Sequence, residues 1–360
     1  MNPRLGVAFL LAGTIAAAAV GGCSKGTSSV APAPSPTASS SPAPDTLYLQ
    51  DATTRTVRGY RNASALRGPA APFLTLPTAD TTNPDVVYSP LFDTLWYPVA
   101  YAPLTFMGDR STPIDVWTAA STKDGRNPDA AVPFSNSAGA AAYDQTHDLL
   151  FVAQVNTNAV QIFASAHTLG SGGNTAPAGS ITLIMTDPGI GSSGPPRAQE
   201  MFYDAVRDRL FVSDNGTIVA VFDAFGSTAN SAAISRTNVP LTASRQISGL
   251  FLSYGLAYNP TADILFVVEA SQKQIDVIHA ASSLNGPAGH TQTITGFNTP
   301  SGLAYDAVRD ILFVYDPINV VVLPNATTAA GTFAAVPNER SFFDVAAAIS
   351  GFGIAVDTTR

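Results

Sequence analysis

The 360-residue chain contains a single cysteine, Cys23, and only 12% of its residues are charged. One cysteine has no partner within the chain, which excludes a fold held together by internal disulfides. Lysine and arginine nowhere form a run, and the formal net charge is −8. Since phosphate backbones require clustered cations, a nucleic-acid partner is excluded, and the body of the chain should not attract anionic lipid electrostatically.

The residue sets of several common catalytic sites are also missing. The four histidines fall in a turn, a strand and two separate connections, so they should not form a metal cluster. There is no Gly-x-Ser-x-Gly nucleophile motif, no Cys-x-x-Cys-His haem site and no Gly-x-x-x-x-Gly-Lys phosphate loop. The sequence therefore identifies no catalytic residue and requires no cofactor.

The first 22 residues contain Arg4, then an Ala-, Leu-, Val- and Gly-rich run that ends at Val20-Gly21-Gly22-Cys23. This segment resembles a bacterial lipoprotein signal peptide with its lipobox, whereas a membrane-spanning helix would be at the lower limit of length. The resemblance implies export, cleavage before Cys23, and lipidation of Cys23 that anchors the chain in the cell envelope. Ser24 would favour the outer membrane in a Gram-negative host. Residues 23–44 then form a lipidated cysteine and a disordered tether of Ser, Thr, Ala and Pro.

From Asp45 onward a ten-residue pattern recurs. Tyr305–Val314 and Tyr203–Val212 are nearly identical, and weaker copies begin at Tyr88, Tyr143 and Tyr258. Each copy is an apolar run, a short polar segment and a Leu-aromatic pair, which is typical of a β-hairpin. The first acid of the polar segment suits an Asx turn. The second acid is present in all six copies, at Asp45, Asp93, Asp148, Asp208, Asp263 and Asp310. An active site would need it once, so we assign it to turn architecture.

A third apolar strand follows each hairpin, and a fourth, more polar strand is plausible after Gly- and Ala-rich connections. The Leu-aromatic pairs are spaced 47 to 60 residues apart. Four short strands per repeat at this spacing predict an all-β fold, the β-propeller.

The two ends of the repeated region complete one another. Gly353–Arg360 matches Gly302–Arg309 position for position. The residues that would follow in the repeat, Asp-x-Leu-aromatic, are found at Asp45–Leu49. We therefore predict a propeller over residues 45–360, with six blades and one blade shared between the N- and C-terminal segments. A seventh blade would need another Asp-x-Leu-aromatic unit within 184–199 or 240–253, and neither segment contains one.

The segment Leu210-Phe211-Val212-Ser213-Asp214-Asn215-Gly216-Thr217-Ile218 resembles the NHL-type, or related YVTN-like, six-bladed propellers. The Gly-Leu-Ala-Tyr-Asp start and the Leu-Phe-Val-x-Asp end of the repeat are kept, whereas the Asn-Arg-Ile core of the NHL family is absent. The resemblance implies the architecture but not a function, because propellers include binding modules, scaffolds and enzymes.

Candidate ligand-binding residues fall in three groups. One aligned column after the second strand is rich in acids: Asp51, Val99, Gln154, Asp214, Glu269 and Asp316. A ring of carboxylates could hold a divalent cation or a polyhydroxylated ligand, or each could accept backbone N–H groups in its own turn. Asp85 and Glu200 stand where other repeats have Gly or Ala, so they are either a ligand or ion site or the lining of a solvent-filled channel. The insertion 100–112, with Tyr101 and Phe106, is either a functional loop or neutral drift.

Two functions are consistent with these observations. The first is a membrane-anchored, monomeric binding or scaffold module that takes a protein, glycan or small ligand at its channel face. The alternative is a lactonase-like hydrolase that uses a divalent cation held by channel carboxylates such as Asp85, Glu200, Asp214 and Asp316.

Overall fold

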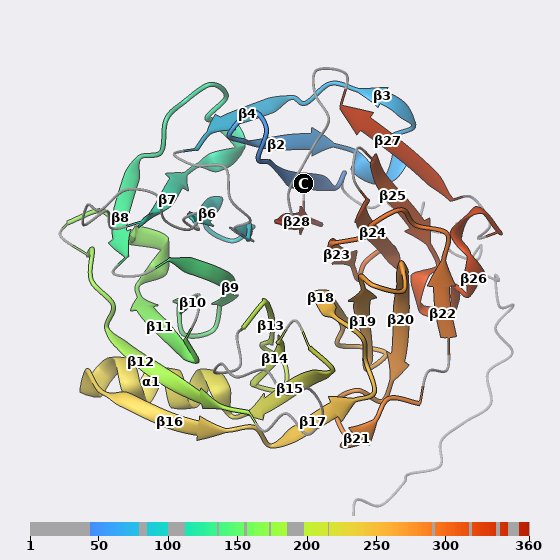
Figure 1. The fold of residues 1–360 in the computed structure, drawn as a ribbon. Coiled ribbons are helices and arrows are strands. Elements are labelled where there is room, and N and C mark those ends of the chain that lie inside the picture. The colour runs from blue at the N-terminus through green and yellow to red at the C-terminus, as the bar shows by residue number, and fades with distance from the viewer. Residues whose placement is uncertain are drawn as a thin grey trace, which may run out of the picture. The chain divides into compact units, whose positions relative to one another are not determined.

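The computed structural model describes residues 44–359, except for 79–84, 100–111, 135–136, 155–156, 173, 186–197, 215, 290–291, 317–318, 336–338 and 345–352. These residues form six β-sheets arranged as blades in a ring around a central axis (Figure 1). The predicted six-bladed propeller is thereby confirmed. Among the described residues, no helix is long and apolar enough to cross a membrane.

The strands of each blade follow one another outward from the axis (Figure 1). Blade 1 contains β28 (Ile354–Asp357), β1 (Thr46–Asp51), β2 (Thr56–Arg61) and β4 (Leu74–Pro77). Blade 2 contains β5 (Val87–Ser89), β6 (Thr94–Pro98), β7 (Thr112–Thr118) and β8 (Ala130–Phe134). Blade 3 contains β9 (Ala138–Asp144), β10 (Leu149–Gln154), β11 (Ala159–Ala164), β12 (Gly179–Ile184) and β16 (Asn238–Thr242).

Blades 1 and 2 have four strands each, whereas blade 3 and the remaining three blades have five. Blade 4 contains β13 (Glu200–Asp204), β14 (Arg209–Ser213), β15 (Ile218–Asp223), β17 (Arg245–Ser248) and β21 (Gly286–Pro287). Blade 5 contains β18 (Ser253–Asn259), β19 (Ile264–Glu269), β20 (Gln274–His279), β22 (Gln292–Thr295) and β26 (Gly331–Thr332). Blade 6 contains β23 (Gly302–Asp306), β24 (Ile311–Asp316), β25 (Asn319–Pro324), β27 (Arg340–Asp344) and β3 (Gly68–Ala70).

The ring closes through the shared blade, as the sequence predicts. β28 pairs antiparallel with β1, so that Leu47 lies opposite Val356 and Tyr48 lies opposite Ala355. The N–H of Gln50 also donates to the carbonyl oxygen of Gly353 over 3.0 Å. The inner strand of blade 1 therefore comes from the C-terminal end of the chain, and its next three strands come from the N-terminal part.

A carboxylate clasp fixes the hairpin between the first and second strands of a blade. Asp306 holds an Asx turn, since its Oδ1 accepts the N–H of Val308 over 2.8 Å. Asp310 adopts a left-handed backbone with φ 54°, which Asp tolerates better than most residues. It accepts the hydroxyl of Tyr305 at 2.9 Å, and the N–H and hydroxyl of Thr327 at 3.1 and 2.7 Å. The assignment of the second acid to turn architecture is confirmed.

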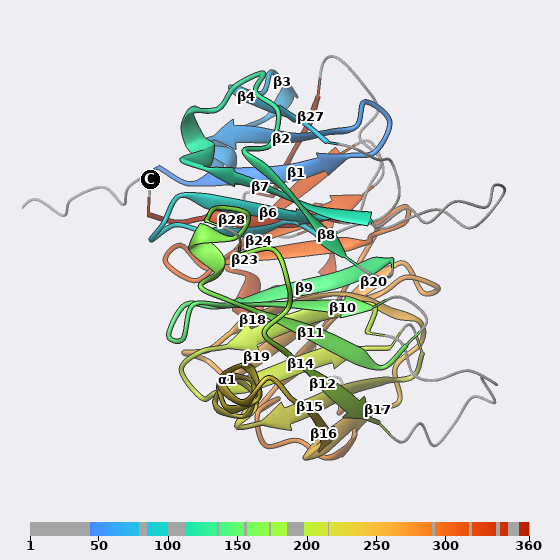
Figure 2. The same ribbon diagram turned by 90° about the vertical axis from the view of Figure 1, so that its left-hand side faces the viewer.

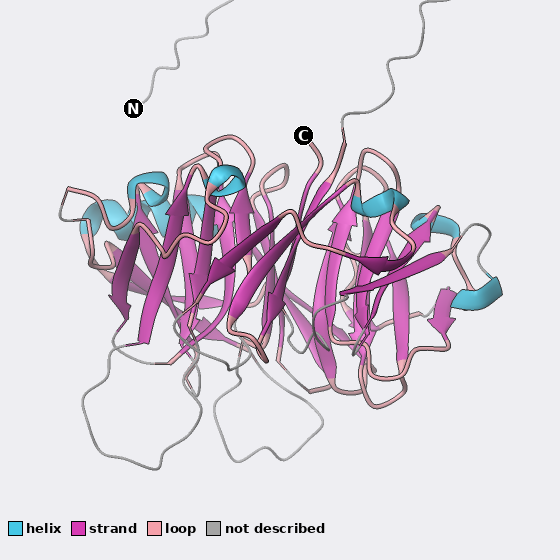
Figure 3. Cartoon of the chain, turned by 90° about the horizontal axis from the view of Figure 1, so that it is seen from above, coloured by secondary structure: helices cyan, strands magenta, loops and turns pink. Residues whose placement is uncertain are grey.

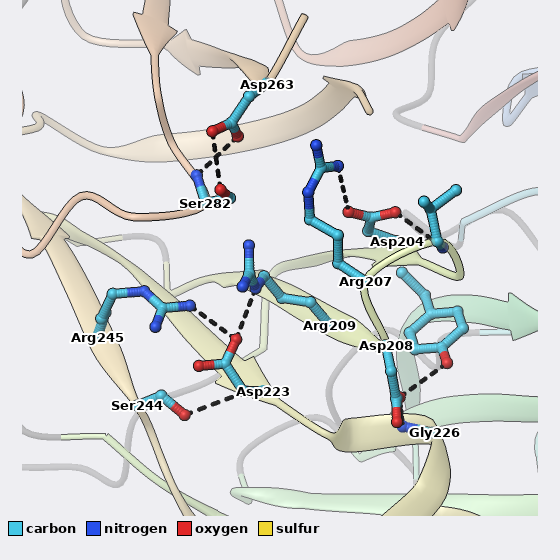
Figure 4. A network of polar contacts seen from close by, with 12 residues as sticks. Asp204, Arg207, Asp208, Arg209, Asp223, Gly226, Ser244, Arg245, Asp263 and Ser282 are labelled. Carbon is cyan, nitrogen blue, oxygen red and sulfur yellow. Dashed lines mark hydrogen bonds and ion pairs between the residues drawn. The ribbon is translucent and has the colours of Figure 1, made fainter. Parts of the chain in front are cut away.

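The clasp recurs around the ring. A Tyr hydroxyl donates to the second acid in five blades, through the pairs Tyr88–Asp93, Tyr143–Asp148, Tyr203–Asp208, Tyr258–Asp263 and Tyr305–Asp310. Figure 4 shows two of these acids, with Asp208 next to Gly226 and Asp263 bonded to Ser282. Each clasp thus ties the inner hairpin to the segment that follows the third strand.

Parallel pairing between neighbouring blades is a feature that the sequence did not reveal. The connection between the third and fourth strands of one blade adds a short outer strand to the blade before it: β16 pairs with β12, β21 with β17, β26 with β22 and β3 with β27. Between blades 1 and 2 the link is smaller, with the N–H of Gly125 bonded to the carbonyl of Thr75 over 2.9 Å. Between blades 2 and 3 the indole of Trp96 donates to the carbonyl of Ala166 over 3.0 Å.

The α-helix α1 (Phe225–Ser235) was also not anticipated. It lies in the connection between the third and fourth strands of blade 4, and it buries Phe225, Ala229, Ala232 and Ala233. These residues recur at helical spacing, which is the signal that could have found it. The short helices η1 (Ala63–Ala65), η2 (Ala120–Thr122), η3 (Ala166–Thr168) and η4 (Ala326–Thr328) occupy the equivalent connections of other blades, and η5 (Phe333–Ala335) follows β26.

The ring has two different faces. One carries the hairpin turns between first and second strands together with the helical connections, and we call it the hairpin face (Figures 2 and 3). The other carries the connections between second and third strands and from one blade to the next, and we call it the loop face.

Large apolar side chains fill the space between blades. Tyr258 of blade 5, for example, lies 4.8 Å from Phe211 of blade 4 between ring centroids.

Candidate functional site

A cavity of about 350 Å³ runs along the axis of the ring. Its lining includes inner-strand residues of all six blades, from Val87 in blade 2 round to Ile354 in blade 1. Most of these side chains are apolar. Asp85 and Glu200 are the only charged residues among its described lining residues.

The structure brings Asp85 and Glu200 together, although they come from blades 2 and 4. Asp85 precedes β5 and accepts two backbone N–H groups, from Val86 at 2.8 Å and from Ala141 of blade 3 at 3.0 Å. Its carboxyl group also shares a hydrogen bond with that of Glu200. Glu200 begins β13 and accepts the N–H of Met201 at 3.3 Å. Since inner strands run from the loop face to the hairpin face, the pair lies toward the loop-face end of the channel.

Two carboxyl groups in contact cannot both ionise easily, so their pKa values move apart. Burial raises the pKa of Asp85 to about 6, and the N–H of Ala141 opposes that rise. Burial and the negative charge of Asp85 together raise the pKa of Glu200 well above its usual value. Asp85 therefore ionises first, and Glu200 keeps its proton to higher pH and can donate it to Asp85. An ionised Asp85 places one negative charge between apolar walls.

We predict that Glu200→Gln will change how the free energy of unfolding depends on pH. Both folded-state pKa values are raised, so the pair stabilises the folded state most at acid pH, and this contribution is lost as the pH rises through about 6 and beyond. The variant should therefore gain about 1–2 kcal/mol of stability relative to the wild type between about pH 5 and about pH 8. Urea denaturation at the two pH values measures this difference. Asp124→Asn, at an exposed carboxylate, is the control, and parallel pH profiles for Glu200→Gln and wild type would contradict the shared proton.

The acids of the aligned column serve separate turns. Asp51 accepts the N–H of Thr53 at 2.9 Å and pairs with Arg58 at 2.9 Å. Asp214 accepts the N–H of Gly216 at 2.8 Å. Asp316 accepts the N–H groups of Asn298 and Thr299 at the start of the connection into blade 6.

The other members of the column behave differently. Gln154 accepts the hydroxyl of Thr157 at 3.4 Å, and Val99 is buried. Glu269 accepts the N–H of Phe251, and burial raises its pKa to about 8, with a further contribution from the charge of Asp276. In the part of the chain that the structure describes, no three His, Cys, Asp or Glu side chains are placed to share a metal ion. The column is thus spread over the blades, and only Asp85 and Glu200 come together.

Several other candidates fall on residues that the structure leaves out. Tyr101 and Phe106 of the insertion, Cys23, the signal peptide and the tether up to residue 43 all lie outside the described residues. Their assignments remain predictions from the sequence.

Comparison with known proteins supports the fold alone. No protein-family model matches the chain, and no curated protein matches it either. A solved structure of a nidogen/laminin complex has a similar chain, with 13% sequence identity, a TM-score of 0.54, and 87% of this chain and 98% of that chain covered. The structure of apo AztD from Citrobacter koseri is also similar, with 10% sequence identity, a TM-score of 0.47, and 87% of this chain and 98% of that chain covered. At 13% identity the likeness to the nidogen/laminin structure indicates a common propeller architecture and no more, and the resemblance to the NHL-type family stays a prediction.

Proposed function

We propose that this protein is a lipid-anchored binding module of the cell envelope and that its ligand site is the axial channel. The observation that carries the proposal is the contact between Asp85 and Glu200 inside a channel with otherwise apolar walls. The equivalent positions of blades 5, 6 and 1 hold Gly255, Gly302 and Gly353. Placing a buried Asp85 and a half-buried Glu200 against apolar walls costs free energy, and such a cost is common at functional sites.

The chemistry of the channel specifies a class of ligand. An ionised Asp85 offers lone pairs, and Val87, Met201 and Leu303 supply apolar contact. A volume of about 350 Å³ is at the small end of ligand pockets. The site therefore suits a small molecule with an ammonium or hydroxyl group on a short apolar body, and the charge of Asp85 favours the ammonium and disfavours a carboxylate.

The ligand class can be tested with a matched series of probes. n-Butylamine, n-butanol and butyrate share one apolar body and differ in their head group. Because a ligand that binds only the folded state raises the unfolding temperature, butylamine should stabilise the protein most and butyrate least. Asp85→Asn should weaken butylamine binding about tenfold or more by removing the charge, which corresponds to about 1.4 kcal/mol. Isothermal titration with both proteins measures this, and equal affinity of the wild type for butylamine and butyrate would contradict the proposed site.

The anchor has a separate test. If Cys23 is the lipidated residue, Cys23→Ser should move the protein from the membrane fraction to the soluble fraction, because the lobe beyond residue 44 has no spanning helix among its described residues. Fractionation followed by mass spectrometry of the N-terminal peptide gives the result. A variant that stays in the membrane fraction and still carries residues 1–22 in its N-terminal peptide would show that this segment is retained as an uncleaved helix.

The hydrolase alternative requires Asp214 and Asp316 to join Asp85 and Glu200 around one cation. Asp214 and Asp316 bond to turns of their own regions of the ring. No observation among the described residues favours that function over ligand binding.

A further inference from the structure

One residue at the tip of each inner hairpin occupies an equivalent position on the hairpin face. It is the second residue after the Asp or Asn of the Asx turn, and its N–H donates to that side chain: Val206 to Asp204 at 3.0 Å, and Val308 to Asp306 at 2.8 Å. Thr146 and Thr359 make the same bond to an Asp in blades 3 and 1, and Thr261 makes it to Asn259 in blade 5. In blade 2 the position belongs to Leu91. The side chain at this position is exposed in all six blades.

The chemistry of these tips alternates around the ring. Blades 2, 4 and 6 carry Leu91, Val206 and Val308, whose exposures are 61%, 78% and 64%. Blades 1, 3 and 5 carry threonine at the equivalent position. A single exposed aliphatic residue needs no explanation, whereas three at every second blade form a regular set. Since the three tips lie at equivalent positions around the mouth of one channel, a flat apolar phase that covers this mouth would contact all three.

The charged groups beside the aliphatic tips are paired. Arg207 forms an ion pair with Asp204 at 3.1 Å, as Figure 4 shows, and Arg309 forms one with Asp306. A paired charge costs less to bring toward an apolar phase than an isolated one. Arginine stems next to aliphatic residues are also common where proteins meet the lipid headgroups.

The N-terminal segment reaches the propeller on this same face. Asp45 occupies the second-acid position of blade 1, where it accepts the N–H and hydroxyl of Ser64 at 2.8 and 2.6 Å. β1 then runs from the hairpin face toward the loop face. Cys23 lies 22 residues before Asp45 in the sequence. The Ser-, Pro- and Ala-rich composition predicts a disordered tether, and a chain of that length spans on the order of 25 Å on average, so a lipid on Cys23 would hold the hairpin face near the bilayer.

We infer that the hairpin face rests on the membrane surface, with Leu91, Val206 and Val308 in the boundary between headgroups and acyl chains. The inference depends on the proposed lipid anchor. The attraction of this face to the membrane is hydrophobic, in keeping with the absence of Lys or Arg runs from the sequence. The loop face, with the Asp85–Glu200 end of the channel, then points away from the membrane.

Single fluorescent labels on the full, lipidated chain test this orientation. Lipidation uses the sulfur of Cys23, so an introduced cysteine is the one free thiol. Val308→Cys places the label at an aliphatic tip, and Gln272→Cys places it on an exposed turn of the loop face. In vesicles of phosphatidylethanolamine and phosphatidylglycerol that contain a lipid-borne quencher, the label at 308 should be quenched at least threefold more than the label at 272.

A second variant separates contact from mere proximity. A label at Thr261→Cys, between the aliphatic tips, should lose most of its quenching when Leu91, Val206 and Val308 are all changed to Ser. These three side chains are exposed, so the changes leave the core intact. Quenching that is equal at 308 and 272, or unaffected by the triple change, would overturn the orientation while leaving the anchor standing. A lipidation-competent chain that fails to bind vesicles at all would overturn both proposals.

Discussion

Deleting residues 353–360 is expected to abolish the cooperative unfolding transition of the propeller. The deletion removes β28, which covers the inner edge of β1 and meets Leu47, Tyr48 and Leu49 in register. These side chains are at most 1% exposed in the closed ring. Opening the ring also exposes the faces between blade 1 and both neighbours. Each apolar side chain so exposed costs about 1.5–3 kcal/mol, and a handful of them equals the roughly 5–15 kcal/mol that stabilises a typical domain.

Urea denaturation followed by the fluorescence of Trp96 and Trp117 measures the effect of the deletion. The best control is a circular permutant in which residues 353–360 are placed directly before Asp45. Arg360 then precedes Asp45 as Arg309 precedes Asp310, which makes blade 1 continuous. The permutant should regain the transition at nearly the wild-type midpoint. A truncated chain that unfolds at the wild-type midpoint would show that the closure contributes nothing.

Asp310→Ala is expected to destabilise the fold by about 3–5 kcal/mol. The carboxylate accepts three hydrogen bonds, from Tyr305 and from the backbone and hydroxyl of Thr327, and hydrogen bonds to a charged group contribute about 1.5–3 kcal/mol each before screening. Alanine must in addition adopt the left-handed backbone at φ 54°, which costs about 1 kcal/mol.

Equilibrium denaturation of purified Asp310→Ala gives the change in free energy of unfolding. Asp124→Ala is a matched control, because that exposed carboxylate accepts one N–H from Thr75 at 2.9 Å. It should cost less than about 1 kcal/mol. Tyr305→Phe, which removes one donor of the clasp, should fall between the two. Equal costs for Asp310→Ala and Asp124→Ala would contradict the structural role of the clasp.

Much of the fold could be predicted because the sequence repeats the same structural unit several times. The hairpins, the six blades and the sharing of blade 1 all follow from aligned copies such as Tyr203–Val212 and Tyr305–Val314. The outer parallel strands could not be predicted in the same way. β21 is only Gly286–Pro287, and so short a segment carries no periodicity of its own. Its pairing depends on where the next blade lies.

The candidate site was predictable in part, for a related reason. Asp85 and Glu200 stand out as exceptions to a position that otherwise holds small residues, and aligning the repeats is enough to find them. Their shared hydrogen bond could not be predicted from the alignment, because it depends on the spacing of blades 2 and 4 across the axis. For Asp51, Asp214 and Asp316 the sequence left two roles open. The structure bonds Asp51 and Asp214 to their own turns and Asp316 to the connection into blade 6, through contacts that alignment of the copies does not specify.

The pairing of β3 with β27 and of β28 with β1 has a consequence for biosynthesis. β1 and β3 therefore lack one neighbouring strand each until the segment that contains β27 and β28 has been made. Contacts of such long sequence separation form late and slowly. Under the proposed export, a chain that cannot close its ring before the C-terminal segment is made would cross the membrane unfolded and fold after export.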